Sequence, residues 1–187
     1  RLRLPTISRS YAKVAEEAAA GNLPYDRYLL ALVEQEVIQR EQNAFALRMK
    51  RAGFPVEKSF ENFDFSASPG IEKQRMLELA ECHWIDKAEV VILVGNPGVG
   101  KSHLANALAL EALKRDYRVL SRPTHRLLAE LNAARALGSH HRTLARILNV
   151  DLLVLDDFGL QPLSAQGVQD LYEIISERYE QRSCMVT

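Results

Sequence analysis

The chain has 187 residues, of which 24 are Lys or Arg and 24 are Asp or Glu, so its formal net charge is zero. Apolar residues make up 47% and charged residues 26%, which excludes a disordered, collagen-like or membrane class of chain. The longest apolar run, Val90 to Val94, is too short to cross a bilayer, and the chain does not begin with a secretory signal. The two cysteines, Cys82 and Cys184, stand far apart without a partner motif, which predicts free thiols and a cytoplasmic protein.

Residues 1–58 have the pattern of a small helical region. Its apolar spacing predicts a short helix over 9–20 and a long helix over 25–52 that ends at Gly53 and Pro55. Two helices with one apolar stripe bury little surface by themselves. We therefore expect this region to contact a partner protein or a neighbouring subunit.

Residues 59–187 alternate between short aliphatic runs and helical segments. Such a pattern predicts an α/β fold, in which a parallel sheet is covered by helices on both faces. Thr124 and Ser164 are expected to cap the helices that they begin. Because the chain starts without Met and stops inside an apolar run, we expect a fragment that lacks the last part of this fold. The expected strands are 90–94, 117–121, 152–155 and 184 onward, and the expected helices are 71–87, 101–115, 124–137, 140–148 and 164–182.

A phosphate-binding loop is the strongest motif in the sequence. It lies directly between the first strand and the following helix and matches the pattern G-x-x-x-x-G-K-[ST] in full. Its glycines allow backbone N–H groups to approach phosphate oxygens, its lysine supplies a positive charge, and its serine offers a hydroxyl to Mg²⁺. The loop residues are Gly95, Asn96, Pro97, Gly98, Val99, Gly100, Lys101 and Ser102.

An acidic pair follows the third expected strand. Asp156 and Asp157 come directly after four aliphatic residues, so they should lie at the carboxyl end of a buried strand, where open α/β sheets bind ligands. We expect Asp156 to hold Mg²⁺ through water from the side opposite Ser102, and Asp157 to accept a proton from, or orient, an attacking water. Aspartates are also common in turns, so the acidic pair indicates a nucleotide site only in combination with the phosphate loop.

These two motifs together resemble those of the AAA+ ATPases. The stretches 151–164 and 170–183 narrow the resemblance to the IstB family. Residues 60–65 and 95–105 also fit the sequence pattern of that family. Proteins of that family are helper ATPases encoded beside the transposase of an insertion sequence, and the DnaC-type helicase loaders share their core.

The resemblance implies a P-loop ATPase with an N-terminal helical region over 1–58 and an AAA+ core over 59–187. It implies ATP and Mg²⁺ as cofactors, Lys101 and Asp157 as catalytic residues, and Phe63 and His103 among the nucleotide contacts. The three phenylalanines of the 60–65 linker are alternatively core residues. The family also implies assembly through ATP that bridges subunits, binding of double-stranded DNA, recruitment of a transposase, and no membrane association.

The segment 122–148 corresponds to an insertion that touches DNA in related ATPases. A solvated helix face explains its basic residues equally well. The candidate DNA contacts are Arg126, Arg135, Arg142 and Arg146.

The function therefore expected is Mg²⁺-dependent ATP hydrolysis coupled to assembly on DNA during transposition. The γ-phosphate sensor and the trans-acting arginine of the class fall outside this sequence, so hydrolysis by this chain should be slow. The alternatives are a DnaC-like helicase loader, a P-loop small-molecule kinase, and a DNA-binding module whose nucleotide site is only structural.

Overall fold

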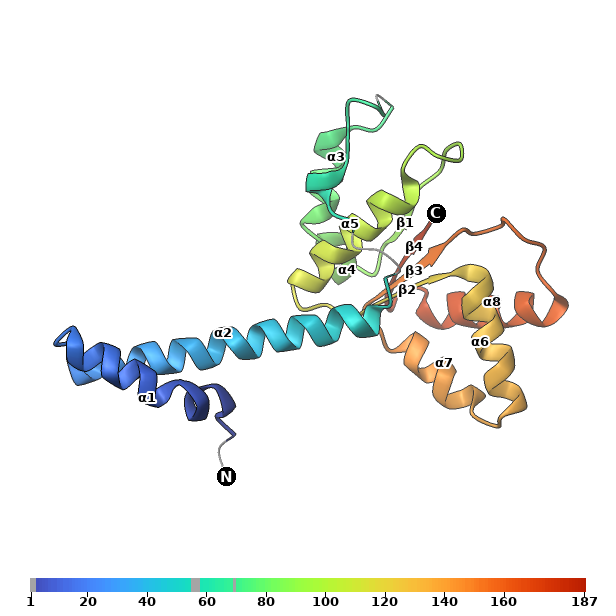
Figure 1. Ribbon diagram of the computed structural model, residues 1–187. Coiled ribbons are helices and arrows are strands. Elements are labelled where there is room, and N and C mark those ends of the chain that lie inside the picture. Colours follow the sequence, from blue (N-terminus) through green and yellow to red (C-terminus); the bar gives the residue numbers. More distant parts are fainter. Residues whose placement is uncertain (1–2, 55–57, 69) are drawn as a thin grey trace. The chain divides into compact units, whose positions relative to one another are not determined.

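The computed structural model describes residues 3–54, 58–68 and 70–187 (Figure 1). Its contacts divide the chain into two compact units, Arg1–Leu47 and Arg48–Thr187. The division falls inside the long helix α2 (Tyr25–Ala52), whereas the sequence pattern changes near residue 58. Pro55, expected to end that helix, lies outside the described residues.

The first unit pairs α1 (Pro5–Ala20) with the beginning of α2. The carboxylate of Glu36 on α2 is buried and accepts hydrogen bonds from the backbone N–H groups of Thr6 (2.8 Å) and Ile7 (3.0 Å). These N–H groups have no partner within their own helix, so Glu36 caps α1 from a distance. The prediction of a start at residue 9 was therefore wrong: α1 begins at Pro5, and the residue that caps it is remote in sequence.

The second unit contains a sheet of 4 parallel strands in the order β1-β4-β3-β2. The parallel arrangement confirms the prediction, and β4 lies between β1 and β3. Because all the strands are parallel, their carboxyl ends meet at one edge of the sheet. The strands are β1 (Val90–Ile92), β2 (Val119–Pro123), β3 (Leu152–Asp156) and β4 (Ser183–Val186).

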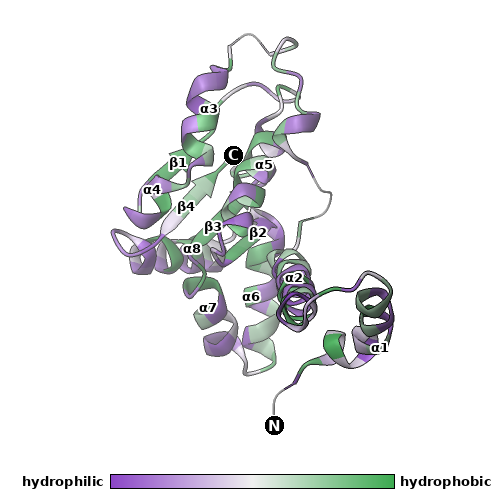
Figure 2. Cartoon of the chain, turned by 90° about the vertical axis from the view of Figure 1, so that its left-hand side faces the viewer, coloured by the Kyte–Doolittle hydropathy of each residue, from purple (hydrophilic) through white to green (hydrophobic). Residues whose placement is uncertain are grey.

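The remaining helices cover this sheet from two sides. In Figure 1, α3, α4 and α5 lie on one side of the strands, and α6, α7 and α8 lie on the other. Figure 2 shows hydrophobic residues concentrated in β3 and β4, in the middle of the sheet. The helical elements are η1 (Phe60–Asn62), α3 (Lys73–Ala80), α4 (His83–Asp86), α5 (Lys101–Lys114), α6 (Thr124–Ala136), α7 (His140–Leu148) and α8 (Ala165–Arg178).

One core cluster lies between the sheet and α6, α7 and α8, and α5 is buried on the opposite side of the sheet. Leu127 and Leu131 of α6 and Ile174 of α8 are fully buried against Leu153 and Leu155 of β3. Burial of apolar side chains of this size contributes about 1.5–3 kcal/mol each. This packing fixes β3, whose carboxyl end carries the acidic pair.

The edge strand β1 is less covered than the sequence predicts. It ends at Ile92 instead of residue 94, and the side chains of Val90 and Ile92 are 55% and 64% exposed. Helices therefore cover both faces in the middle of the sheet as expected, whereas the side chains of Val90 and Ile92 on β1 stay exposed.

Two helix predictions also need correction. The segment expected as one helix over 71–87 is divided into α3 and α4 at the buried Cys82, which has a left-handed backbone (φ 64°). The helix expected over 164–182 ends at Arg178, and Glu180 beyond it has φ 55°. A positive φ interrupts the helical hydrogen-bond pattern, and nothing in these side chains announces it.

The two predicted caps have different outcomes. Ser164 caps α8, because its hydroxyl accepts a hydrogen bond from Gly167 N (3.1 Å). Thr124 is the first residue of α6 and does not cap it. Its hydroxyl donates instead to the carbonyl oxygen of Asp156 at the end of β3.

No helix among residues 3–54, 58–68 and 70–187 is long and apolar enough to cross a membrane.

Candidate nucleotide-binding site

The phosphate-loop sequence forms the turn between β1 and α5. Gly98 and Gly100 have φ angles of +85° and +95°, which a side chain would strain. A Cβ atom on Gly100 would also lie 2.5 Å from Cε2 of Phe63. The loop therefore depends on glycine for its backbone conformation and, at Gly100, for close packing.

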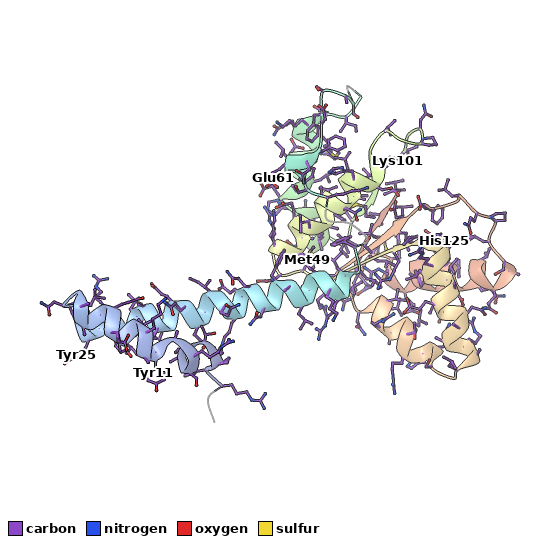
Figure 3. All side chains as sticks on the ribbon, in the orientation of Figure 1. Tyr11, Tyr25, Met49, Glu61, Lys101 and His125 are labelled. Atoms are coloured by element: carbon purple, nitrogen blue, oxygen red, sulfur yellow. The ribbon has the colours of Figure 1, made fainter. Side chains whose placement is uncertain are left out.

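Lys101 is the first residue of α5, and Figure 3 shows it where the loop enters that helix. Its Nζ donates to the carbonyl oxygens of Gly95 (2.9 Å) and Asn96 (3.0 Å), so the side chain lies against its own loop. Since a lysine ammonium has three N–H donors, this arrangement leaves one for an anion. The partial positive charge at the N-terminus of α5 acts in the same direction.

The carboxylate of Asp156 is hydrogen-bonded to two strand-end or loop hydroxyls. Ser102 Oγ donates to Asp156 Oδ1 at 2.8 Å, and Thr187 Oγ1 donates to the same oxygen. The backbone N–H of Asp157 also donates to Asp156 Oδ1 (3.1 Å). The structure thus brings together the phosphate-loop serine and the first acidic residue, as the sequence motifs lead us to expect.

Asp157 has a left-handed backbone, with φ 54°. Aspartate adopts this conformation more readily than most residues with a side chain. Its backbone N–H is 3.3 Å from Thr187 Oγ1, and its exposed side chain lines the cavity described next. The turn after β3 therefore separates the acidic pair: Asp156 points to Ser102, and Asp157 lies at the cavity wall.

A cavity of about 750 Å³ lies at this edge of the sheet. Its size suits a ligand of the size of a nucleotide. Eight of the expected site residues line it: Gly95, Pro97, Gly98, Gly100, Lys101, Ser102, His103 and Asp157. The lining also includes Lys58, Ile92, Leu93, Val94, Phe158, Leu160, Val186 and Thr187, which the sequence motifs did not indicate.

Phe63 occupies a place behind the loop. Its ring is 5.2 Å from the ring of His103 and 4.8 Å from that of Phe65, in edge-to-face contacts, and it packs on Gly100. Among the described residues Phe63 is not part of the cavity lining, so its contacts support the loop. His103 does line the cavity, and its Nε2 donates to the carbonyl oxygen of Ser59 (2.9 Å).

The four arginines expected to contact DNA differ in their surroundings. Arg135 pairs with the buried Asp170 (2.5 Å), and Arg146 pairs with Glu130. Arg126 and Arg142 are exposed and form no ion pair within the described part of the chain. Two of the four are therefore engaged in holding helices together.

Sequence reasoning missed three polar contributors to the site. Thr187 belongs to no motif, and Lys58 stands at the expected boundary between residues 1–58 and 59–187. Thr124 had been assigned a capping role. The signal that could have found Thr124 and Thr187 is their position at strand ends, because β2, β3 and β4 all end at the same edge.

Comparisons with known proteins agree with this geometry. Residues 1–187 match the family model described as IstB-like ATP binding protein. The chain is 35% identical over 187 residues to a predicted ATP-binding protein of insertion sequence IS21 from Pseudomonas aeruginosa, covering 100% of the chain and 71% of the relative. It is 29% identical over 187 residues to the corresponding protein of IS5376 from Geobacillus stearothermophilus, covering 100% of the chain and 74% of that relative.

Solved structures with the same fold include helicase loaders and replication initiators. A crystal structure of the DnaC helicase loader matches with a TM-score of 0.55 and 28% identity, over 61% of this chain and 66% of the loader. The AMPPCP-bound DnaA of Aquifex aeolicus matches with a TM-score of 0.60 and 23% identity, over 72% of this chain and 42% of that one. The chain thus spans less than two thirds of either solved chain. Together with the loop, the acidic pair and the sheet order, the family match shows that this chain belongs to the IstB-like ATP binding proteins, on an AAA+ P-loop fold.

Proposed function

We propose that this chain binds ATP with Mg²⁺ at the carboxyl edge of its sheet, hydrolyses it, and uses the nucleotide to control assembly on double-stranded DNA in support of a transposase. The observation that carries the proposal is the hydrogen bond between Ser102 and Asp156, which are 54 positions apart. This bond joins the phosphate loop to the acidic pair beside a cavity of nucleotide size.

In this proposal the loop grips the phosphates. Its backbone N–H groups and the N-terminus of α5 attract phosphate oxygens, and the glycines allow them to approach. Lys101 keeps part of its hydrogen bonding to the carbonyl oxygens of Gly95 and Asn96. Its remaining N–H donates to the terminal phosphates. The hydrogen bonds to these carbonyls hold the ammonium beside the loop before a ligand arrives.

Ser102 and Asp156 fit a magnesium ion. One hydroxyl and one carboxylate are a suitable donor set, because Mg²⁺ usually keeps several waters and takes further ligands from the phosphates. When bound, Mg²⁺ supplies charge neutralisation at the phosphates. The three hydrogen bonds at Asp156 Oδ1 hold this carboxylate in one orientation.

Asp157 is the residue that we assign to the attacking water. Its side chain is exposed at the cavity wall, and its backbone is held by Asp156 and Thr187. A carboxylate in this place can accept a hydrogen bond from a water and orient its lone pair toward the terminal phosphate. His103 we assign to the nucleotide because it lines the cavity.

DNA binding is the least constrained part of the proposal. Arg126 and Arg142 are exposed and free of ion pairs among the described residues, so they can reach phosphate groups without breaking an ion pair. Arg135 and Arg146 can take part only by giving up their ion pairs with Asp170 and Glu130. We therefore expect Arg126 and Arg142 to contribute more.

Partnership with a transposase is supported by the relatives, whose names assign them to insertion sequences. Assembly into oligomers through bound ATP is supported by the AAA+ fold. The 28% identity with a DnaC helicase loader favours one alternative, the loading of a replicative helicase. Co-purification of the chain with its neighbouring transposase or with a hexameric helicase would distinguish them.

The experiment that tests the proposal measures particle size on DNA by analytical ultracentrifugation. We expect the chain to form larger particles on a double-stranded DNA fragment with Mg²⁺ and a non-hydrolysable ATP analogue than without the nucleotide. Lys101→Ala should abolish this difference. Particles of the same size with and without the analogue would contradict the proposal.

A further inference from the structure

We propose that Thr124 is a positioning residue for the magnesium ligand Asp156, and that it acts by holding the last carbonyl of β3. This inference rests on the nucleotide site proposed above. The juxtaposition that carries it is the 3.0 Å hydrogen bond from Thr124 Oγ1 to Asp156 O.

The end of the sheet explains why this hydroxyl is needed. Pro123 and Asp156 are the last paired residues of β2 and β3. Beyond this pair the chain turns into α6, so the β-ladder ends just where the acidic pair begins. The Thr124 hydroxyl supplies a donor to the Asp156 carbonyl at this position.

The hydrogen bond between Thr124 and Asp156 is partly shielded from solvent. Thr124 is only 2% exposed and is the first residue of α6. Asp156 is therefore held at both ends, since Thr124 holds its carbonyl, and Ser102 and Thr187 hold its carboxylate. Loss of the Thr124 hydrogen bond should loosen the backbone of Asp156, which orients the Asp156 carboxylate.

The expected consequence is a loss of magnesium affinity with little loss of nucleotide affinity. Mutation of a residue that orients a metal ligand typically lowers the metal affinity 10–100-fold. The phosphate loop reaches the nucleotide from β1 and α5, whereas the Thr124 hydroxyl hydrogen-bonds to the end of β3. A residue that served only the stability of the fold would not separate these two affinities.

The test is a calorimetric titration of the whole chain with a non-hydrolysable ATP analogue at a series of Mg²⁺ concentrations. For Thr124→Val, which keeps the shape and removes the donor, we expect the Mg²⁺ concentration that gives half of the affinity gain to rise about 10-fold or more. Affinity measured in EDTA should stay within about 2-fold of the wild type. Thr124→Ser retains the hydroxyl and should restore the wild-type Mg²⁺ dependence.

Two further variants keep the result interpretable. Thr143→Val removes a hydroxyl from α7 and should leave the Mg²⁺ dependence unchanged. Thr124→Ala is the second test variant if Thr124→Val does not fold, because alanine is well tolerated in a helix. A folded variant without the hydroxyl that shows the wild-type Mg²⁺ midpoint would overturn the inference. Failure of the wild type to gain affinity with Mg²⁺ would instead overturn the proposed function.

Discussion

At the scale of single residues, Gly100 carries two constraints that are usually separate. Its φ of +95° disfavours any side chain, and the Phe63 ring occupies the place where a Cβ would lie. Gly98 has the first constraint without the second, because nothing lies within 4 Å of its Cβ position. The two glycines therefore allow backbone strain to be separated from packing.

We predict that Gly100→Ala destabilises the protein more than Gly98→Ala does. Backbone strain alone costs about 1–3 kcal/mol, and the contact with Phe63 adds to it in Gly100→Ala. Urea unfolding of both variants measures the difference. Gly70→Ala is the control, since Gly70 has open space and no positive φ in the left-handed range. Equal losses at Gly98 and Gly100 would contradict the packing role of Phe63.

Asp151 is a second residue whose contribution can be measured, through the pH dependence of stability. Burial raises its pKa, but the hydrogen bonds from Arg118 and the charges of Arg118 and Arg182 lower it more, so the pKa lies below the ordinary value. The folded state therefore favours the ionised form. Its stabilisation is complete above the ordinary aspartate pKa of about 3.9 and is lost as the pH falls through the lower folded value.

We predict that Asp151→Asn lowers the free energy of unfolding at pH 7, and that the difference from the wild type shrinks below about pH 4. At low pH the wild-type carboxyl becomes neutral and resembles the amide. Urea unfolding curves at several pH values measure this convergence. A difference that stays constant down to about pH 3 would contradict the assignment of the lowered pKa.

At the scale of elements, α8 is fixed at its C-terminal end by a buried arginine. Arg178 is 1% exposed, and its guanidinium also donates to the Cys184 sulfur (3.3 Å). Its other N–H groups donate to carbonyl oxygens at the end of α7 and at the starts of β3 and β4. These are the 5 carbonyls of Ile147, Leu148, Val150, Asp151 and Ser183.

We predict that Arg178→Met lowers the free energy of unfolding by about 3 kcal/mol or more, because several carbonyls lose their donor. Arg178→Lys should also be strongly destabilising, since an ammonium cannot reach all of them. Arg142→Met is the matched control on an exposed arginine and should change stability by about 0.5 kcal/mol at most. Urea unfolding distinguishes them, and similar small effects at both arginines would refute the role of Arg178.

At the scale of the whole molecule, the sequence could predict those features that depend on local pattern. Aliphatic runs predicted the strands, and the loop Gly95–Ser102 with Asp156 predicted where the site lies. Features that depend on remote contacts could not be predicted this way. Glu36 caps α1 from another helix, and Cys82 adopts a positive φ that its side chain does not announce.

The candidate site shows the same division. Lys101 and Ser102 were recognisable because their motif has fixed spacing. Thr124 and Thr187 were not, because only the pairing of β2 and β4 with β3 brings them to Asp156. The family resemblance placed Phe63 among the nucleotide contacts, whereas its packing behind Gly100 depends on the tertiary structure.

The most direct measurement of the central claim is a calorimetric titration of the chain with ATP and Mg²⁺. We predict saturable binding to the wild type and a loss of at least about 10-fold in affinity, or ~1.4 kcal/mol, in Lys101→Ala. Lys87→Ala, at an exposed lysine outside the cavity, should bind like the wild type. Absence of binding by the folded wild type, or equal affinity in Lys101→Ala, would contradict the claim that the loop and the acidic pair form a nucleotide site.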